Sequence, residues 1–292
     1  MEAQKVPSIE DIQKAGRKLA DGMNELVEQQ LITGSCIYGS TGLDLSSGLN
    51  PETSESYITR RSDIDIFIAI SGENKPHRKA VREVIRSAAS NDRELVCIDA
   101  IIMSEDDLSM GLHGLDRFFG YHLGGPGRVV AGEDPSKLVN YPETPAAEII
   151  SSYLANKNRR MSKAYNQLTI DSIKDGGLQR MFELPVAVAR KAVQALREVR
   201  GEDINLASAD KTAVHQAALQ VMGQDSEILT GYKALAAMNN QYDLLLQQTL
   251  SAEIDSDQYE AALKHYHSKL PAAMTWLSRL GHYLLPKLEV DN

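Results

Sequence analysis

The stretch RSDIDIFI, residues 61–68, places two aspartates two positions apart at the start of a run of β-branched and aromatic residues. Such a run is typical of a β-strand, in which positions i and i+2 face the same side. Asp63 and Asp65 are therefore expected to project side by side from one strand. Two adjacent carboxylates repel each other unless a cation lies between them. A divalent metal is the usual cation, and Mg²⁺ prefers carboxylate and phosphate oxygens.

A second apolar segment, residues 31–38, precedes this strand and leads into Gly39-Ser40. Glycine lets the backbone approach a phosphate group closely, and serine offers a hydroxyl and an N–H as donors. The intervening residues 44–59 are rich in Ser, Gly, Asn and Glu, so they are predicted to be an inserted loop. Arg61, two positions before Asp63, is a candidate to neutralise the acidic pair or a phosphate.

A third apolar strand is predicted at residues 94–103, and it carries Asp99 in its middle. The two cysteines, Cys36 and Cys97, fall in the predicted first and third strands. They are interpreted as small buried side chains of a protein in a reducing compartment.

The order of these elements resembles the nucleotidyltransferases of the DNA polymerase β superfamily, whose signature is Gly-Ser, a spacer, Asp-x-Asp on a strand and a third carboxylate on a later strand. The segment from Gly127 to Pro135, with the pattern Gly-x-Val-Val-x-Gly-x-Asp-Pro, is similar to the end of the catalytic domain in aminoglycoside-type adenylyltransferases. One departure is the spacer after Ser40, which is longer than the family usually has. An insertion that displaced Gly39-Ser40 would keep the fold and lose the activity.

The resemblance implies a role for each residue of the motif. Asp63, Asp65 and Asp99 would be catalytic and would bind two Mg²⁺ ions, with Asp99 also a candidate base for the acceptor hydroxyl. Gly39 and Ser40 would hold the β- and γ-phosphates of a nucleoside triphosphate, with ATP the expected donor.

Strand-like patterns stop at the predicted linker, residues 141–145, and only helical periodicities follow. The sequence therefore predicts an α+β fold, with a small mixed-sheet nucleotidyltransferase core at residues 1–140 and an all-α helical bundle domain at residues 146–292. The predicted helices lie at residues 9–26, 76–90 and 106–122 in the first domain, and at 146–170, 178–200, 208–222, 227–250 and 258–285 in the second.

In the resembling family the helical domain usually supplies basic groups to the triphosphate. Arg190 and Lys191 are the nucleotide-binding candidates in this sequence, and Arg159, Arg160 and Lys163 are further candidates on the first helix of the bundle. The helical half is also a candidate surface for a homodimer.

The composition is that of an acidic globular chain, with a net charge of −9 and 42% hydrophobic residues. No apolar run is long enough for a signal peptide or a membrane span, so a cytoplasmic protein without membrane contact is expected. The acidic balance disfavours broad, sequence-independent nucleic-acid binding, which depends on neutralising phosphates. The cationic residues at 77–86 are interpreted as a solvated helix face.

Three acceptors remain open for the predicted transfer: a small hydroxylated molecule, a protein side chain or an RNA 3′ end. The acidic charge favours the small molecule, since a cationic one would be attracted to an acidic cleft. Two other readings of the motif also remain open. A metal-binding Asp-x-Asp serves some glycosyltransferases, and a decayed site would leave a nucleotide-binding or interaction module.

Overall fold

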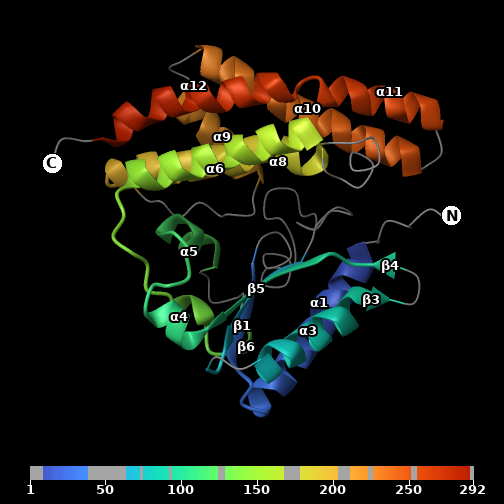
Figure 1. The fold of residues 1–292 in the computed structure, drawn as a ribbon, viewed down its shortest axis with the longest axis vertical. Coiled ribbons are helices and arrows are strands. Elements are labelled where there is room, and N and C mark those ends of the chain that lie inside the picture. Colours follow the sequence, from blue (N-terminus) through green and yellow to red (C-terminus); the bar gives the residue numbers. More distant parts are fainter. Residues whose placement is uncertain are drawn as a thin grey trace. The chain divides into compact units, whose positions relative to one another are not determined.

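The computed structural model describes residues 9–38, 64–72, 75–91, 94–123, 129–167, 178–202, 211–222, 226–250 and 255–289. These residues form two compact units, one ending at Glu143 and the other beginning at Thr144 (Figure 1). The first contains a mixed sheet and helices, and the described part of the second is helical. The chain therefore has an α+β fold.

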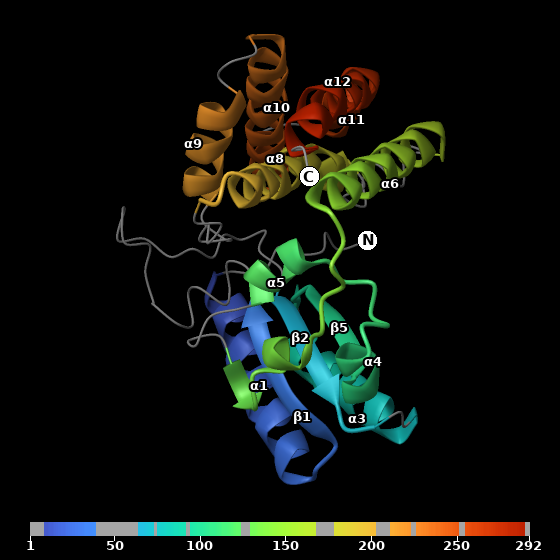
Figure 2. The same cartoon turned by 90° about the vertical axis from the view of Figure 1, so that its left-hand side faces the viewer.

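The central sheet has the strand order β5-β2-β1-β6. Strand β1 (Ile32–Tyr38) is antiparallel to both β2 (Ile64–Ile70) and β6 (Val129–Gly132), whereas β2 and β5 (Ile98–Ser104) are parallel. Figure 2 shows β1, β2 and β5 side by side. Because β2 runs opposite to β1 and alongside β5, the end of β1 and the starts of β2 and β5 meet at one edge of the sheet.

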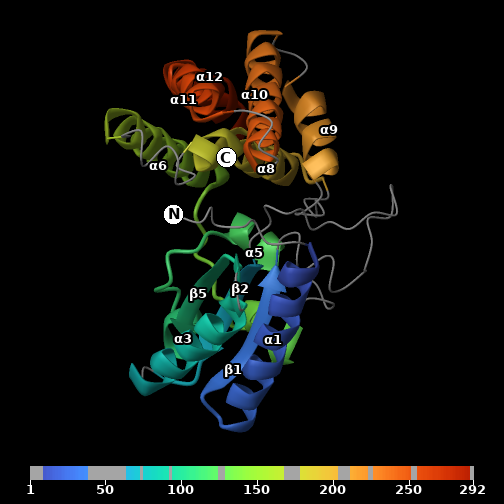
Figure 3. The same cartoon turned by 90° about the vertical axis from the view of Figure 1, so that its right-hand side faces the viewer.

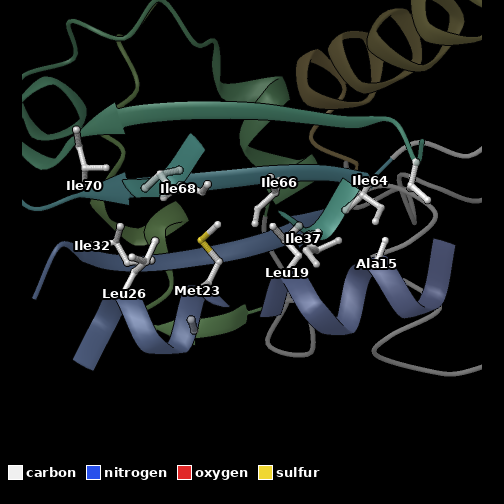
Figure 4. Close-up of a cluster of buried hydrophobic side chains, with 14 of the residues drawn as sticks. Ala15, Leu19, Met23, Leu26, Ile32, Ile37, Ile64, Ile66, Ile68 and Ile70 are labelled. Carbon is white, nitrogen blue, oxygen red and sulfur yellow. The ribbon is translucent and has the colours of Figure 1, made fainter. Parts of the chain in front are cut away.

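One face of this sheet is covered by α1 (Ile9–Glu28) and α3 (Lys75–Ala89), which pack against each other (Figure 3). Residues with even numbers in β2 face these helices, because side chains alternate along a strand. Figure 4 shows Leu19, Met23 and Leu26 of α1 packed with the isoleucines of β1 and β2. This cluster is the main core of the first unit.

The other face is covered by short elements: α4 (Glu105–Ser109), α5 (Arg117–Leu123) and the 3₁₀ turn η1 (Pro135–Leu138). A second apolar cluster lies there, around Cys36, Phe67 and Leu108. The single helix predicted at residues 106–122 is wrong, since two helices replace it. Gly111 and Gly114 have φ angles of +72° and +66°, which a right-handed helix does not accommodate.

The predicted third strand, residues 94–103, is also wrong in its extent. Glu94–Leu95 (β4) pairs with Ser90–Asn91 (β3) in a separate two-stranded ladder, and β5 begins only at Ile98. Cys97 lies between β4 and β5 and is exposed, whereas Cys36 is fully buried. The prediction of two buried thiols therefore holds for Cys36 and fails for Cys97.

The second unit consists, in its described residues, of six helices. They are α6 (Ala146–Gln167), α8 (Leu178–Val199), α9 (Lys211–Met222), α10 (Ser226–Leu250), α11 (Ser256–His267) and α12 (Leu270–Leu288). Helices α11 and α12 replace the single helix predicted at residues 258–285. Trp276 joins α12 to α10 by donating its indole N–H to the Ile228 carbonyl at 3.0 Å. None of the helices in the described part of the chain has the length and apolar composition that crossing a bilayer requires.

Candidate functional site

Asp65 and Asp99 occupy the same position on neighbouring strands. They are register partners in the parallel pair of β2 and β5, and neighbouring strands lie about 4.8 Å apart. The ladder continues one step further, because the Ile64 N–H donates to the Cys97 carbonyl at 2.9 Å. This bond fixes the register at the start of both strands, so two carboxylates that are 34 positions apart in the sequence become neighbours.

The two carboxylates also share a face of the sheet. Phe67 and Ala69 follow Asp65 at two-residue steps and belong to the second apolar cluster, which also packs against Ile101 and Met103 of β5. Since side chains alternate along a strand, Asp65 and Asp99 lie on this same face, opposite to α1 and α3. We call the pair and its edge of the sheet the acidic edge.

Tyr38 extends this row to a third strand. It is the register partner of Asp65 in β1 and lies on the same face, 8% exposed. Its ring packs edge-on against Phe119 of α5, with 5.7 Å between ring centroids. Tyr38, Asp65 and Asp99 therefore form one row across three strands, and β1 ends at Tyr38, the register partner of Asp65.

The two carboxylates of the acidic edge differ in exposure. Asp65 is partly buried, whereas Asp99 is exposed. An exposed carboxylate next to a partly buried one gives hard oxygen donors that open to solvent on one side. This donor set suits a divalent cation that keeps part of its coordination for a substrate.

Four predicted site residues, Gly39, Ser40, Arg61 and Asp63, lie outside the residues that the structure describes. Among the described residues, no three His, Cys, Asp or Glu side chains gather closely enough to hold a metal ion. Of the three predicted carboxylates, the structure therefore describes Asp65 and Asp99.

The helical unit holds a cluster of cations on α6 and α8. The ammonium groups of Lys157 and Lys191 lie 5.0 and 4.3 Å from the centroid of the same ring, that of Tyr153. Burial lowers the pKa of Lys157, and the positive charges of Arg160, Lys191 and Arg190 lower it further. We call these four side chains with Tyr153 the basic cluster.

The structure brings together some of the predicted basic residues of this unit and not others. Arg190, Lys191 and Arg160 lie close enough to Lys157 for their charges to lower its pKa. Arg159 instead donates to the Asn156 side chain at 3.3 Å on an exposed part of α6, and Lys163 is also exposed.

Sequence reasoning missed Tyr38, Tyr153 and Lys157. The signal for Tyr38 was its place as the last strand residue before Gly39-Ser40. For Tyr153 and Lys157 the signal was their four-residue spacing, which places them on one helix face, three residues before Arg160. Lys191 comes from another helix, and sequence spacing could not have placed it over Tyr153.

Comparison with models of known protein families and with curated protein sequences finds no match for this chain. Its function is therefore argued from the geometry of the acidic edge and the basic cluster.

Proposed function

We propose that the protein is a Mg²⁺-dependent nucleotidyltransferase that moves a nucleoside monophosphate, with AMP favoured, from a nucleoside triphosphate to an acceptor hydroxyl. The observation that carries the proposal is the register of Asp65 and Asp99 at the edge of the sheet where β1 ends. The resemblance predicts a third carboxylate on a later strand, and adjacency to Asp65 is what that role requires. The finer fold, a nucleotidyltransferase core followed by a helical bundle, is part of the proposal.

In the proposed reaction, the acceptor oxygen attacks the α-phosphorus, the bond from the α-phosphorus to the bridging oxygen breaks, and pyrophosphate leaves. Asp65 and Asp99, together with Asp63, would hold the metal ions. Asp99 is the exposed member of the described pair, so it is the candidate to accept the proton of the acceptor hydroxyl. When bound by these carboxylates, Mg²⁺ would supply neutralisation of the negative charge that develops during the transfer.

Other residues bind and orient the triphosphate in this proposal. Gly39 and Ser40 hold its β- and γ-phosphates, and Arg61 neutralises charge beside the carboxylates. Arg190 and Lys191 belong to the basic cluster, whose cations repel one another. A bound anion would reduce this repulsion. We assign them to the polyphosphate, and Lys191→Met should raise the KM for the nucleotide more than it lowers kcat.

The acceptor is proposed to be a small hydroxylated molecule, in line with the acidic net charge of −9. A protein side chain or an RNA 3′ end is the alternative acceptor. The second candidate function is a nucleotide-binding module without turnover, and the same assay separates the two.

The test is pyrophosphate release from each of the four nucleoside triphosphates with Mg²⁺, with and without size-fractionated cell extract. We expect release that depends on one nucleotide and on the small-molecule fraction. Asp65→Asn should lower it at least about 100-fold, since a metal ligand contributes several kcal/mol to the barrier. Dependence on the protein or RNA fraction would identify the alternative acceptor, and absence of release from every nucleotide would favour the module without turnover.

Asp106→Asn is the matched control, because Asp106 is an exposed acid of α4 in the same unit. It should leave pyrophosphate release unchanged. The Asp65→Asn protein should keep an equal or higher melting temperature, since one partner of a repulsive pair is neutralised. A large loss of stability would mean that the acidic edge is structural and would contradict the assignment.

A further inference from the structure

Four cations form a straight row along α3. Lys75, Lys79, Arg82 and Arg86 follow one another at spacings of four, three and four residues, which places them on one side of a helix. All four are exposed. At 1.5 Å of rise per residue the row is about 16 Å long. We call it the α3 row.

The opposite side of α3 is fixed to the rest of its unit. Val81 and Ala88 are buried in the main core, and Val84 lies against Gly22 of α1. Arg78 donates from its guanidinium to the Ile102 carbonyl of β5 at 2.9 Å. These contacts set the rotation of the helix, so the α3 row is held facing away from the sheet rather than free to turn inward.

The positive charge of the row is only weakly offset. Glu83 is the single acid in the α3 sequence, and it contacts Lys79 at 3.7 Å with side-chain exposures of 57% and 79%. An ion pair this exposed contributes little. Within the described part of the chain, no ion pair joins Lys75, Arg82 or Arg86 to an acid. The excess of positive charge is local, because the whole chain has a net charge of −9.

We infer that the α3 row is a docking surface for the phosphate backbone of a nucleic-acid strand. The four cations are spread over about 16 Å, so each can contact a separate phosphate of one strand. Arginine side chains such as Arg82 and Arg86 match phosphate oxygens with paired N–H groups. The apolar side of α3 is committed to the core, so the helix has no apolar face to insert into a lipid surface.

This surface is separate from the acidic edge. Helix α3 covers the face of the sheet opposite to Asp65 and Asp99, so a strand bound there leaves the carboxylates accessible. The binding is expected to be independent of sequence, because contacts to phosphates carry no information about the bases. The inference does not depend on the proposed enzymatic activity.

The test is fluorescence anisotropy of a labelled, mixed-sequence single-stranded RNA titrated with the full-length protein. Four phosphate contacts predict a slope of about −3 for log affinity against log salt, so binding weakens about 50-fold between about 50 and 200 mM salt. Arg82→Gln/Arg86→Gln removes two contacts. It should weaken binding at low salt and reduce the loss over the same salt range to about 7-fold.

Lys233→Gln/Lys264→Gln is the matched control, because it removes two exposed cations from the helical unit with the same change in net charge. It should retain the full salt dependence. The inference fails if RNA does not bind at low salt, or if the two double variants lose affinity equally. It also fails if the protein binds phosphatidylserine vesicles through the α3 row and does not bind RNA. Pyrophosphate release should be the same in all three proteins, so a failure here is distinguishable from a failure of the proposed function.

Discussion

Cys36 and Cys97 show how local structure makes two residues of the same type differ in exposure. Cys36 lies in β1 and is fully buried in the second apolar cluster, which Phe119 of α5 packs against. Cys97, two residues before Asp99, is exposed. We predict that one thiol reacts rapidly with a chromogenic disulfide reagent in the native protein and that two react after denaturation. Bound Mg²⁺ and nucleotide should slow the labelling of Cys97. Two fast thiols in the native protein would contradict the burial of Cys36.

Gly34 is a second residue whose identity is set by its surroundings. A Cβ atom at Gly34 would collide with the backbone carbonyl oxygen of Glu133, next to β6. Backbone atoms cannot rotate away as a side chain can, so Gly34→Ala should separate β1 from β6 and lower the free energy of unfolding by about 1–3 kcal/mol. Chemical denaturation followed by circular dichroism measures this change.

Gly281→Ala provides the contrasting variant, because its Cβ would meet only the Leu154 side chain at an ordinary 3.4 Å inside α12. Alanine favours a helix over glycine by about 1 kcal/mol, so this variant should be neutral or stabilising. An equal loss of stability in both variants would show that the close approach at Gly34 is not the cause.

The pair of Asp65 and Asp99 shows which features of single residues can be predicted from the sequence and which cannot. The strand preference of the residues around each aspartate was visible in the sequence, because β-branched runs and period-2 alternation are local features. Their adjacency was implied only by the family resemblance. It depends on the register between β2 and β5, and no local pattern fixes the pairing of strands so distant in the chain.

At the scale of elements, α6 and α8 bring the cations of the basic cluster together. The lowered pKa of Lys157 means that its protonated form is disfavoured in the folded protein. The unfolded chain then binds more protons than the folded one between the two pKa values, so stability rises with pH across that window. At neutral pH, protonated Lys157 therefore costs stability.

Lys157→Met should raise the melting temperature at pH 7, because it removes this charge and keeps an unbranched side chain over Tyr153. The gain should shrink as the pH approaches the ordinary lysine pKa of about 10.4, where the unfolded chain also loses the proton. Thermal unfolding at several pH values measures it. Lys163→Met, at an exposed position of the same helix, should change little, and a gain of equal size and pH dependence would contradict the role of the basic cluster.

The errors in the two wrongly predicted helices share a physical cause. The predicted helices at residues 106–122 and 258–285 have continuous apolar periodicity, but each divides into two helices. Periodicity reports which face of a helix is buried and not whether the backbone continues. In the first case Gly111 and Gly114 adopt left-handed φ angles, and in the second the chain ends α11 at His267 and starts α12 at Leu270, just before Pro271.

At the scale of the whole molecule, the chain joins a sheet-containing unit to a unit that is helical in its described residues, with the division at Glu143. The change from strand-like to helical periodicity along the sequence predicts this kind of α+β chain, because the described residues of the first unit all precede those of the second.

The central claim is that Asp65 and Asp99 act together on a divalent cation, and Mn²⁺ binding followed by electron paramagnetic resonance tests it most directly. Mn²⁺ replaces Mg²⁺ as the probe, with a non-hydrolysable ATP analogue present. We predict that Asp65→Asn and Asp99→Asn each weaken Mn²⁺ binding by more than about tenfold, while Asp106→Asn does not. Equal Mn²⁺ binding by the wild-type protein and by both acidic-edge variants would contradict the claim.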